Sequence, residues 1–461
     1  MRKHERSAKG KVVGMEADTC IKGAHILYHG EVLKGCIAIS DGKIAFLGKE
    51  ANAPRAERIL DARGLLALPG PIDAHVHLRD EGLAYKEDFY SGTCSAVAGG
   101  ITSVLDMPNN SPLVDSASRL AERARKARGT IVANVGFYSL LPADLNGLRA
   151  IAEAGAVAIK VFMHEPRTEL PVWDEAMLLK AVSLANRLGL PVAFHAEDPG
   201  IIGEAKCKLR PGLDPVSKFV LSHPPEAEVE AVGKLARLLR GLRVHICHAS
   251  VPRAVELAKG AGFTVEATPH HLFLSSDLYE RLGPIALMDP PLRPRELVMA
   301  LRALLYDGLI DIVASDHAPH ALGEKLSTDH VPPGIPGLET MLPLLLNEVA
   351  EGRLSLQHLI SLVCEGPARI FGLRAGRLEV GWPADLVLVD LRAKHVVKPD
   401  AFFSKAKFSP FEGLELRGRP IGTIVNGQLA FWDGEVVARR GCGRILKPEG
   451  QSRGQGDEVP S

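Results

Sequence analysis

No stretch of about 18 or more apolar residues occurs in the chain, so no membrane-spanning helix is predicted. An excess of charge of one sign is also missing, because 55 Lys and Arg residues balance 55 Asp and Glu residues. Aromatic residues are scarce, at 5% of the sequence. These three shortages argue against a membrane or nucleic acid as the main partner, since both are usually recognised by basic patches or stacked aromatic rings.

The 7 cysteines include no CxxC pair, and their number is odd. This pattern indicates free thiols in a reducing compartment rather than a disulfide framework. The basic N-terminus is not followed by the apolar segment of a signal peptide. We therefore expect a cytoplasmic protein. With 461 residues, 46% of them hydrophobic, the chain can build one large domain and a smaller companion without disulfides.

Eight β-rich runs alternate with amphipathic helical segments through the middle of the chain. Alternating β and α segments predict a parallel sheet, and eight such units favour a closed TIM-type (β/α)8 barrel. A doubly wound open sheet is the alternative, although no glycine fingerprint follows the first run. The eight runs read LLALPGPIDAHVHL, ITSVLDM, TIVANVGFY, AVAIKVFM, PVAFHAE, RVHICHAS, FTVEATPHHLFL and DIVASDHAPH.

The two flanks of this region read as short strands and turns, and they predict one small composite β-sandwich built from both ends of the chain. The polar end, rich in Gly, Ser and Pro, predicts a disordered tail. The expected organisation is a flexible N-terminus at 1–19, the first part of the sandwich at 20–64, the barrel at 65–375, the second part of the sandwich at 376–442 and the tail at 443–461.

Polar side chains recur where the predicted barrel strands end, which is the face on which barrel enzymes carry their chemistry. His75 and His77 are two residues apart on one strand and therefore share a face. Imidazole and carboxylate groups are preferred ligands of borderline divalent metals, so the set predicts a metal centre. The complete set is His75, His77, Lys160, His195, His248 and Asp316.

Lys160 and two nearby histidines, His245 and His164, need separate interpretation. Lys160 as an ammonium would be strongly disfavoured beside metal ions, but its neutral amine can take up carbon dioxide and become a bridging carbamate. The alternative is a salt-bridged lysine at the barrel rim. His245, three residues before His248, faces away from the site in a regular strand and is predicted to pack in the core. His164 can reach the site, although nothing in the sequence fixes its position there.

The segments PGPIDAHVHLRDEGLAYKEDF and GGITSVLDMPNNSP resemble the first metal motif and the first substrate loop of class I dihydroorotases, members of the amidohydrolase superfamily. The motifs AIKVFM, FHAED, HICHAS, TPHHLFL, DPPLR, ASDHAPH and GIPGLET follow in that family's order. GWPADLVLVD, FSPFEG and GTIVNGQ resemble its C-terminal sandwich. The resemblance extends over residues 25–435 and implies the reversible cyclisation of N-carbamoyl-L-aspartate to L-dihydroorotate plus water, in de novo pyrimidine biosynthesis.

The resemblance also implies a site for two divalent metal ions, usually Zn²⁺. His75 and His77 would bind the first ion, and His195 and His248 the second. Carboxylated Lys160 would bridge the two ions, and Asp316 would complete the first ion's shell. A hydroxide held between the ions would be the nucleophile, with Asp316 as general base and then general acid.

Substrate choice requires a cation, because dihydroorotate carries a free carboxylate that hydantoins and allantoin lack. Arg79 has the strand parity of the paired histidines, and its planar fork suits a carboxylate. Asn109 in the MPNN turn and His320, four residues after Asp316, resemble the family's other carboxylate contacts.

The sequence departs from the family pattern in three places. HLRDEG replaces the frequent HLREPG, with Asp80 and Glu81 at the changed positions, and MPNNSP replaces MPNTxP. Asp289 stands where Asn, a ring contact, is frequent, and a carboxylate cannot donate a hydrogen bond unless it is protonated. The contact to the substrate ring at Asp289 therefore differs from the one that the family pattern implies.

Two alternative functions stay open. A hydantoinase or allantoinase would share the metal site but does not usually carry the Arg79 and Asn109 pairing. A non-catalytic scaffold relative would typically have lost metal ligands, whereas all six positions are filled here. The sequence does not distinguish a monomer from a homodimer or from a complex with aspartate carbamoyltransferase.

Overall fold

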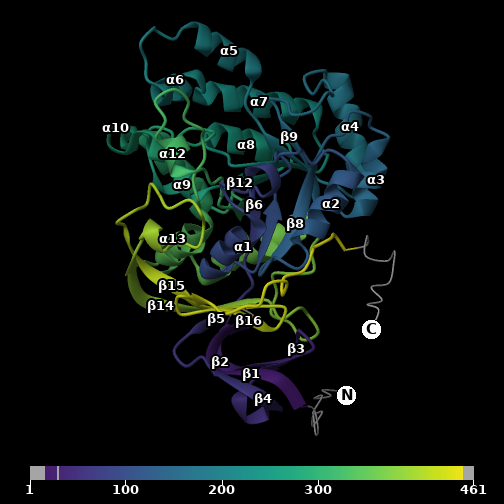
Figure 1. Cartoon of the computed structure of the whole chain (residues 1–461), viewed down its shortest axis with the longest axis vertical. Helices are drawn as coiled ribbons and strands as arrows, with labels where there is room; N and C mark the ends of the chain where they lie inside the picture. Colours follow the sequence, from purple (N-terminus) through teal and green to yellow (C-terminus); the bar gives the residue numbers. More distant parts are fainter. Residues whose placement is uncertain (1–15, 29–30, 450–461) are drawn as a thin grey trace, which may run out of the picture.

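The computed structural model describes residues 16–28 and 31–449. A helix-covered barrel lies above a β-domain that contains the N-terminal strands (Figure 1). The predicted fold class, a TIM-type barrel with a small β-domain from both flanks, is confirmed. Most of the predicted flexible N-terminus and most of the predicted tail lie outside the described residues. The part of the 1–19 segment that is described belongs to a strand, because the first strand begins at Glu16.

The barrel sheet contains eight parallel strands in sequence order. The ring closes where Val76 bridges His317 in parallel and the His77 amide donates to the His317 carbonyl oxygen at 2.8 Å. Nearly all strand residues are buried, as expected for strands enclosed on both faces. The strands are β6 (Ile72–Val76), β7 (Ser103–Asp106), β8 (Asn134–Leu140), β9 (Ala158–Phe162), β10 (Val192–His195), β11 (Val244–Ile246), β12 (Thr264–Ala267) and β13 (Ile312–Val313).

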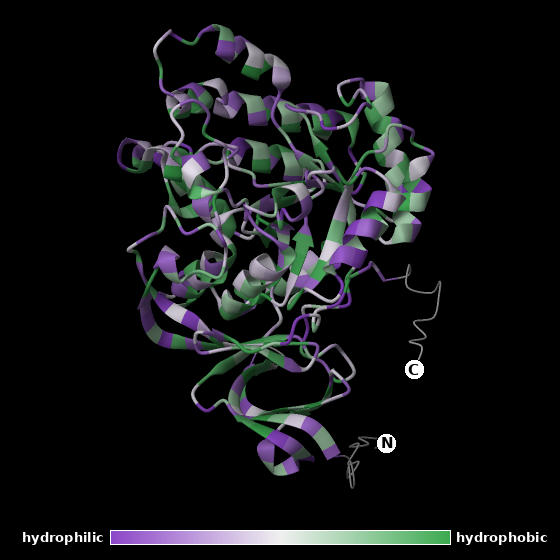
Figure 2. Cartoon of the chain, in the orientation of Figure 1, coloured by the Kyte–Doolittle hydropathy of each residue, from purple (hydrophilic) through white to green (hydrophobic). Residues whose placement is uncertain are grey.

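Helices surround this ring, and several begin at an Asp or Ser whose side chain accepts from a backbone amide in the first helical turn. The strands are largely apolar, whereas the helices carry both polar and apolar residues (Figure 2), as amphipathic helices on a core do. The helices are α1 (Phe89–Ala98), α2 (Ala117–Ala127), α3 (Gly147–Ala154), α4 (Glu175–Arg187), α5 (Pro199–Cys207), α6 (Pro215–Ser222), α7 (Pro225–Leu238), α8 (Pro252–Gly260), α9 (Pro269–Phe273), α10 (Tyr279–Leu282), α11 (Arg295–Tyr306), α12 (Leu322–Lys325), α13 (Leu338–Ala350), α14 (Leu356–Ile360) and α15 (Gly366–Phe371).

The second sheet combines both ends of the chain, because β5 from the N-terminal part pairs antiparallel with β14 from the C-terminal part. Tight turns with positive φ at Asp41 and Asn426, each followed by Gly, connect two of its hairpins. Its strands are β1 (Glu16–Tyr28), β2 (Glu31–Ser40), β3 (Lys43–Gly48), β4 (Arg55–Asp61), β5 (Leu66–Pro69), β14 (Leu386–Val396), β15 (Glu415–Val425), β16 (Gln428–Trp432) and β17 (Glu435–Val436).

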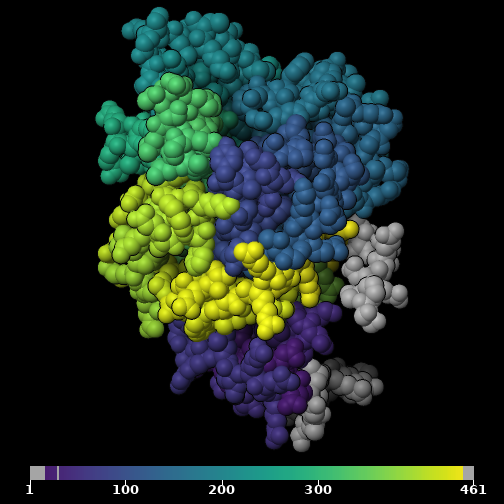
Figure 3. All heavy atoms as spheres, viewed as in Figure 1, coloured from purple at the N-terminus to yellow at the C-terminus, as the bar shows by residue number. Residues whose placement is uncertain are grey.

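Two chain segments differ from the predicted boundaries. The first predicted barrel strand is two strands, β5 in the second sheet and β6 in the barrel, because the intervening Pro-Gly-Pro sequence at 69–71 interrupts the ladder. Residues 443–449 of the predicted disordered tail are ordered: Ile445 bridges Val135, and the Leu446 amide donates to the Val135 carbonyl at 2.8 Å. Apolar side chains at 445 and 446 supply the packing that a tail lacks. The last part of the chain lies as a band between the barrel and the N-terminal strands (Figure 3).

Within residues 16–28 and 31–449, no helix has both the length and the apolar character that crossing a membrane requires. All seven cysteines belong to these ranges and are free thiols.

Candidate active site

Five of the six predicted metal ligands line one pocket of about 800 Å³ at the C-terminal ends of the barrel strands: His75, His77, His195, His248 and Asp316. Asp316 Oδ1 lies 3.5 Å from Nε2 of His75 and 3.3 Å from Nε2 of His77. The His248 ring centroid lies 5.2 Å from that of His75 and 4.5 Å from that of His195. The structure therefore brings together side chains that are up to 241 positions apart in the sequence.

The outward-facing nitrogen of three histidines is held by an oxygen. His75 Nδ1 lies 2.8 Å from Glu266 Oε1, and His195 Nε2 lies 2.8 Å from Glu197 Oε2. His77 Nδ1 lies 2.7 Å from the amide oxygen of Asn109. These oxygens accept hydrogen bonds, so the facing ring nitrogens carry the protons, and Nε2 of His75 and His77 and Nδ1 of His195 keep free lone pairs.

Burial favours the neutral imidazoles that metal binding requires. It lowers the pKa of His75, holds the pKa of His77 and His248 well below the ordinary value, and lowers that of His195 to about 3. Neutral rings with a fixed tautomer are ready to accept a divalent ion without first losing a proton.

Lys160 is the sixth predicted ligand, and its side chain is 1% exposed. Its Nζ has no hydrogen-bond partner among the described residues. An ammonium left unpaired in this position is costly, and a buried anion is costly as well unless it coordinates a metal ion. Four imidazoles, one carboxylate and this lysine form a donor set that fits divalent metal ions.

The backbone is strained at the residues that shape this site. Arg79, His248 and Asp316 have φ values of 55°, 33° and 45°, a region that costs non-glycine residues about 1–3 kcal/mol. His317, next to Asp316, has neighbours at both of its ring nitrogens. The Gly337 amide donates to His317 Nδ1 at 3.2 Å, so Nε2 carries the ring proton and faces Glu87 Oε2 at 3.4 Å.

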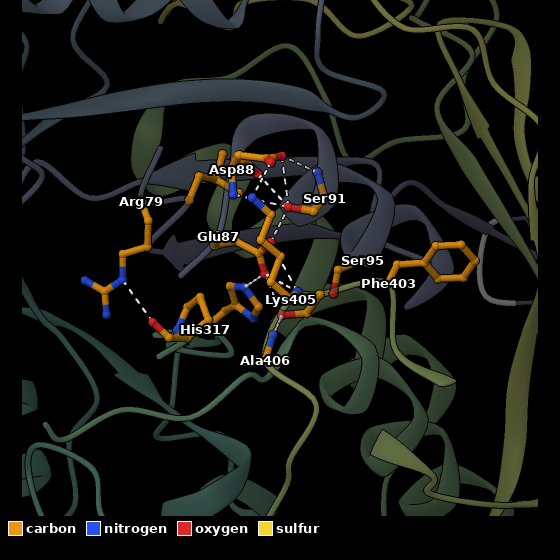
Figure 4. A network of polar contacts seen from close by, with 12 residues as sticks. Arg79, Glu87, Asp88, Ser91, Ser95, His317, Phe403, Lys405 and Ala406 are labelled. Carbon is orange, nitrogen blue, oxygen red and sulfur yellow. Dashed lines mark hydrogen bonds and ion pairs between the residues drawn. The ribbon is translucent and has the colours of Figure 1, made fainter. Parts of the chain in front are cut away.

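Glu87 connects this strand end to two other parts of the molecule (Figure 4). Its backbone oxygen accepts from the Asp80 amide at 2.9 Å, next to strained Arg79. Its carboxylate accepts from the Ser404 hydroxyl and, at 3.3 Å, from the Lys405 amide. Glu87 thus holds the loop after β6, the end of β13 and the C-terminal segment in one arrangement.

Arg79 and His320, two of the predicted substrate contacts, lie side by side in the pocket. Arg79 Nε donates to the Pro319 carbonyl at 3.3 Å, and its Nη2 lies 3.3 Å from His320 Nε2. His320 Nδ1 lies 3.0 Å from Lys86 Nζ. Burial, together with Arg79 and Lys86, lowers the pKa of His320, so the ring is neutral. Burial lowers the pKa of Arg79 to about 10, which leaves the guanidinium charged at neutral pH.

The other two predicted contacts have different neighbours. Asn109 lines the pocket, but its side-chain oxygen faces His77. Asp289 Oδ2 lies 3.3 Å from His164 Nε2, and its Oδ1 lies 3.7 Å from His195 Nε2. His164, whose position the sequence leaves open, is thus held at the pocket by Asp289.

Three buried acids support the site without having been predicted from the sequence: Glu87, Glu197 and Glu266. Each is 0% exposed. A signal for two of them is present, because Glu197 follows His195 by two residues and Glu266 is an acid within the apolar run of β12. An acid that a strand carries into the core requires a partner, and here the partner is a histidine of the site. His245, predicted to pack in the core, is 0% exposed and lies 3.4 Å from Glu266.

Residues 66–430 match the model of the Amidohydrolase family. The chain belongs to the amidohydrolase family. Its site is therefore that of a metal-dependent hydrolase of cyclic amides. The "Dihydroorotase" of Methanosarcina acetivorans is 36% identical to this amidohydrolase, over 96% of this chain and 98% of the relative. The "Dihydroorotase" of Aquifex aeolicus is 35% identical, over 90% and 99% of the two chains.

Solved structures of amidohydrolases are also similar to this one. The L-hydantoinase (dihydropyrimidinase) from Arthrobacter aurescens superimposes with a TM-score of 0.87 at 30% identity, over 94% of this chain and all of that one. A D-hydantoinase from Thermus sp. superimposes with a TM-score of 0.86 at 27% identity, over 94% of this chain and 99% of that one. The fold is thus shared with proteins named hydantoinase and dihydropyrimidinase, so the fold alone does not select the substrate.

Proposed function

We propose that this amidohydrolase is a dihydroorotase, which interconverts L-dihydroorotate plus water and N-carbamoyl-L-aspartate. The observation that carries the proposal is the Arg79 guanidinium, which lines the same pocket as His77 and Asp316. A buried, charged fork suits a substrate with a free carboxylate, and the amidohydrolase relatives that cover nearly the whole chain carry the name dihydroorotase.

The proposed cofactor is a pair of Zn²⁺ ions. The first ion would be held by His75, His77 and Asp316. The second would be held by His195 and His248, and carboxylated Lys160 would bind both ions. When bound, such ions polarise the scissile carbonyl and lower the pKa of the attacking water. The fixed tautomers described above keep the ring nitrogens of His75, His77 and His195 directed as ligands.

Asp316 moves the proton in the proposed reaction. Burial raises the pKa of its carboxyl, which makes it a better proton acceptor than an exposed aspartate. In the hydrolytic direction Asp316 Oδ accepts the proton of the attacking water and delivers it to the ring amide nitrogen as the C–N bond breaks. In the direction of ring closure it takes a proton from the ureido nitrogen and returns it to the departing water.

Arg79, Asn109 and His320 are the proposed contacts of the substrate carboxylate. The guanidinium of Arg79 supplies the charge, and the planar fork fixes the orientation of the ring. Asp289 is the proposed neighbour of the substrate ring. A fixed ring places its scissile amide beside Asp316, so that the same aspartate can serve both directions.

The test is turnover of the zinc-loaded protein on dihydroorotate, carbamoyl-aspartate, hydantoin and allantoin, with and without a chelator. We expect chelator-sensitive interconversion of the first two compounds only. In R79Q, kcat/KM for dihydroorotate should fall at least about 10–100-fold, because the substitution removes a charged bidentate contact to the substrate carboxylate. E165Q, which neutralises an exposed side chain at the same pocket, is the matched control.

The second candidate is a hydantoinase, which the similar solved structures favour. Turnover restricted to hydantoin, with R79Q unchanged, would establish that function and reject ours. The absence of bound metal from the purified protein would instead support the scaffold alternative. The cytoplasmic location and assembly as a homodimer or with aspartate carbamoyltransferase remain predictions, and sedimentation with and without that enzyme tests the assembly.

A further inference from the structure

A second group of metal-binding side chains lies beside the six residues already described. It consists of His164, Glu197, His223 and Asp289, and one donor atom from each lies within 4.8 Å of the others. His164 follows β9, Glu197 follows β10, His223 follows α6, and Asp289 precedes α11. Three of the four line the 800 Å³ pocket, so an ion can reach the group from solvent.

The hydrogen bonds of His223 leave its inner nitrogen available. His223 Nδ1 lies 2.8 Å from the Phe219 carbonyl oxygen, which can only accept, so Nδ1 carries the proton. The ring also stacks on Phe219 with a centroid distance of 4.1 Å, which fixes its plane. Nε2 of His223 therefore keeps its lone pair, as a metal ligand must.

The two carboxylates of the group have oxygens that no described residue satisfies. Glu197 is fully buried, and its Oε1 has no hydrogen-bond partner within the described ranges, nor has Oδ1 of Asp289. The nearest cation is Arg293, with Nη2 3.8 Å from Glu197 Oε1. Arg293 is committed elsewhere, because its Nε donates to the Ser250 hydroxyl and its Nη1 to the His223 carbonyl.

Two carboxylates close together in a buried wall are unfavourable, and they would also repel the anionic substrate proposed for this pocket. A divalent cation would offset both charges. Two imidazoles and two carboxylates form a ligand set typical of zinc and similar ions.

We infer that His164, Glu197, His223 and Asp289 form a third divalent-cation site, which takes Zn²⁺ or a similar borderline ion in the pocket wall. The site adjoins the proposed second ion, because Glu197 uses Oε2 for His195 and has Oε1 free for the additional ion. The inference depends on no particular substrate and holds equally for a hydantoinase.

The test is anomalous diffraction at the zinc edge from crystals of the full chain grown with Zn²⁺, combined with metal analysis of the same protein. We expect one anomalous peak between the four side chains, in addition to the peaks at His75, His77, His195 and His248. The ratio of zinc to protein should be three. In D289N and in H223N this peak should disappear, and the ratio should fall to two.

Two controls separate this inference from the proposed function. H77N should keep the peak at His164 and Asp289 while losing zinc from the main centre, and E165Q should keep all three ions. Peaks at the main centre alone, with a ratio of two in wild type, would overturn the third site and leave the proposed function intact. In that case the two imidazoles would pair with the carboxylates as protonated cations.

Discussion

The two ends of the barrel both bury polar side chains but use them in opposite ways. At the C-terminal end, Lys160 Nζ and Asp289 Oδ1 have no hydrogen-bond partner among the described residues, and Asp316 has a strained backbone. At the N-terminal end, Asn134, Asp385 and Asn426 bond to one another. The difference indicates that buried groups without hydrogen-bond partners, or on strained backbone, bind ligands. Buried groups with hydrogen-bond partners stabilise the fold.

The N-terminal cluster joins the barrel to the second sheet. Asp385 accepts from the Asn426 amide at 2.6 Å and from Asn134 Nδ2 at 3.0 Å. The Asn134 side-chain oxygen accepts from Asn426 Nδ2 at 2.7 Å and from the Arg444 amide at 3.0 Å. Asn134 starts β8, Asp385 directly precedes β14, and Arg444 belongs to the ordered part of the predicted tail, so one network fixes three segments.

Among substitutions that compare the two barrel ends, D316N is expected to have the largest effect on kcat. The amide cannot accept the proton, so kcat should fall about 10³-fold, within the range of lost general acid–base catalysis. The thermal unfolding midpoint should stay within a few degrees of wild type, because a strained position contributes little stability. Steady-state rates and a melting curve measure both quantities. A variant that keeps its rate would remove Asp316 from the mechanism.

The opposite result is expected from D385A. Removing the carboxylate leaves the Asn426 amide and Asn134 Nδ2 buried without an acceptor, which should lower the free energy of unfolding by about 3 kcal/mol. Urea denaturation measures this loss, with E379A, an exposed glutamate of the same part of the chain, as a control. Well below the unfolding midpoint, kcat should equal that of wild type. A large fall in kcat would show that the N-terminal end of the barrel also affects catalysis at the C-terminal end.

Glu339 is a half-buried acid at the start of α13 whose carboxylate accepts from the Phe403 and Ser404 amides, and its effect on stability should depend on pH. Burial raises the pKa of Glu339 to about 7 from its ordinary 4.5. The folded state then binds the proton more tightly, so its contribution to stability is present below about pH 4.5 and is lost as the pH rises to 7. E339Q should match wild type near pH 4.5 and exceed it by about 2–3 kcal/mol at pH 8, as urea denaturation at both values would show. An equal difference at both pH values would contradict the assignment.

The smallest effect is expected from E87Q, which changes a positioning residue. The glutamine cannot accept from Ser404 and Lys405 and also face the ring proton of His317, so the Asp316 loop should shift and kcat should fall about 10-fold. KM and metal content should stay unchanged. S404A, which removes one donor and keeps the carboxylate beside His317, should change kcat less. An altered KM with an unchanged kcat would mean that Glu87 acts on Arg79 instead.

The sequence by itself determined the fold class and the spacing of the histidines, because both depend on local patterns. Eight apolar runs with intervening helices favoured a barrel over an open sheet, and the two histidines of an HxH pair in a strand share a face whatever the tertiary arrangement. It also determined the chemical type of the strand-end residues, from which a divalent-metal site follows. The resemblance to dihydroorotases added the roles expected of Arg79 and Asn109.

Only the tertiary structure decided which side chains meet. Glu266 became the partner of His75, 191 positions away, because β12 and β6 stand at fixed places in the ring, whereas Glu197 lies only two residues from its partner His195. The split between β5 and β6 and the ordering of residues 443–449 likewise depend on long-range pairing with β14 and with Val135. The pairing of His164 with Asp289 is of the same kind, since the loops that carry them meet only when the barrel has closed.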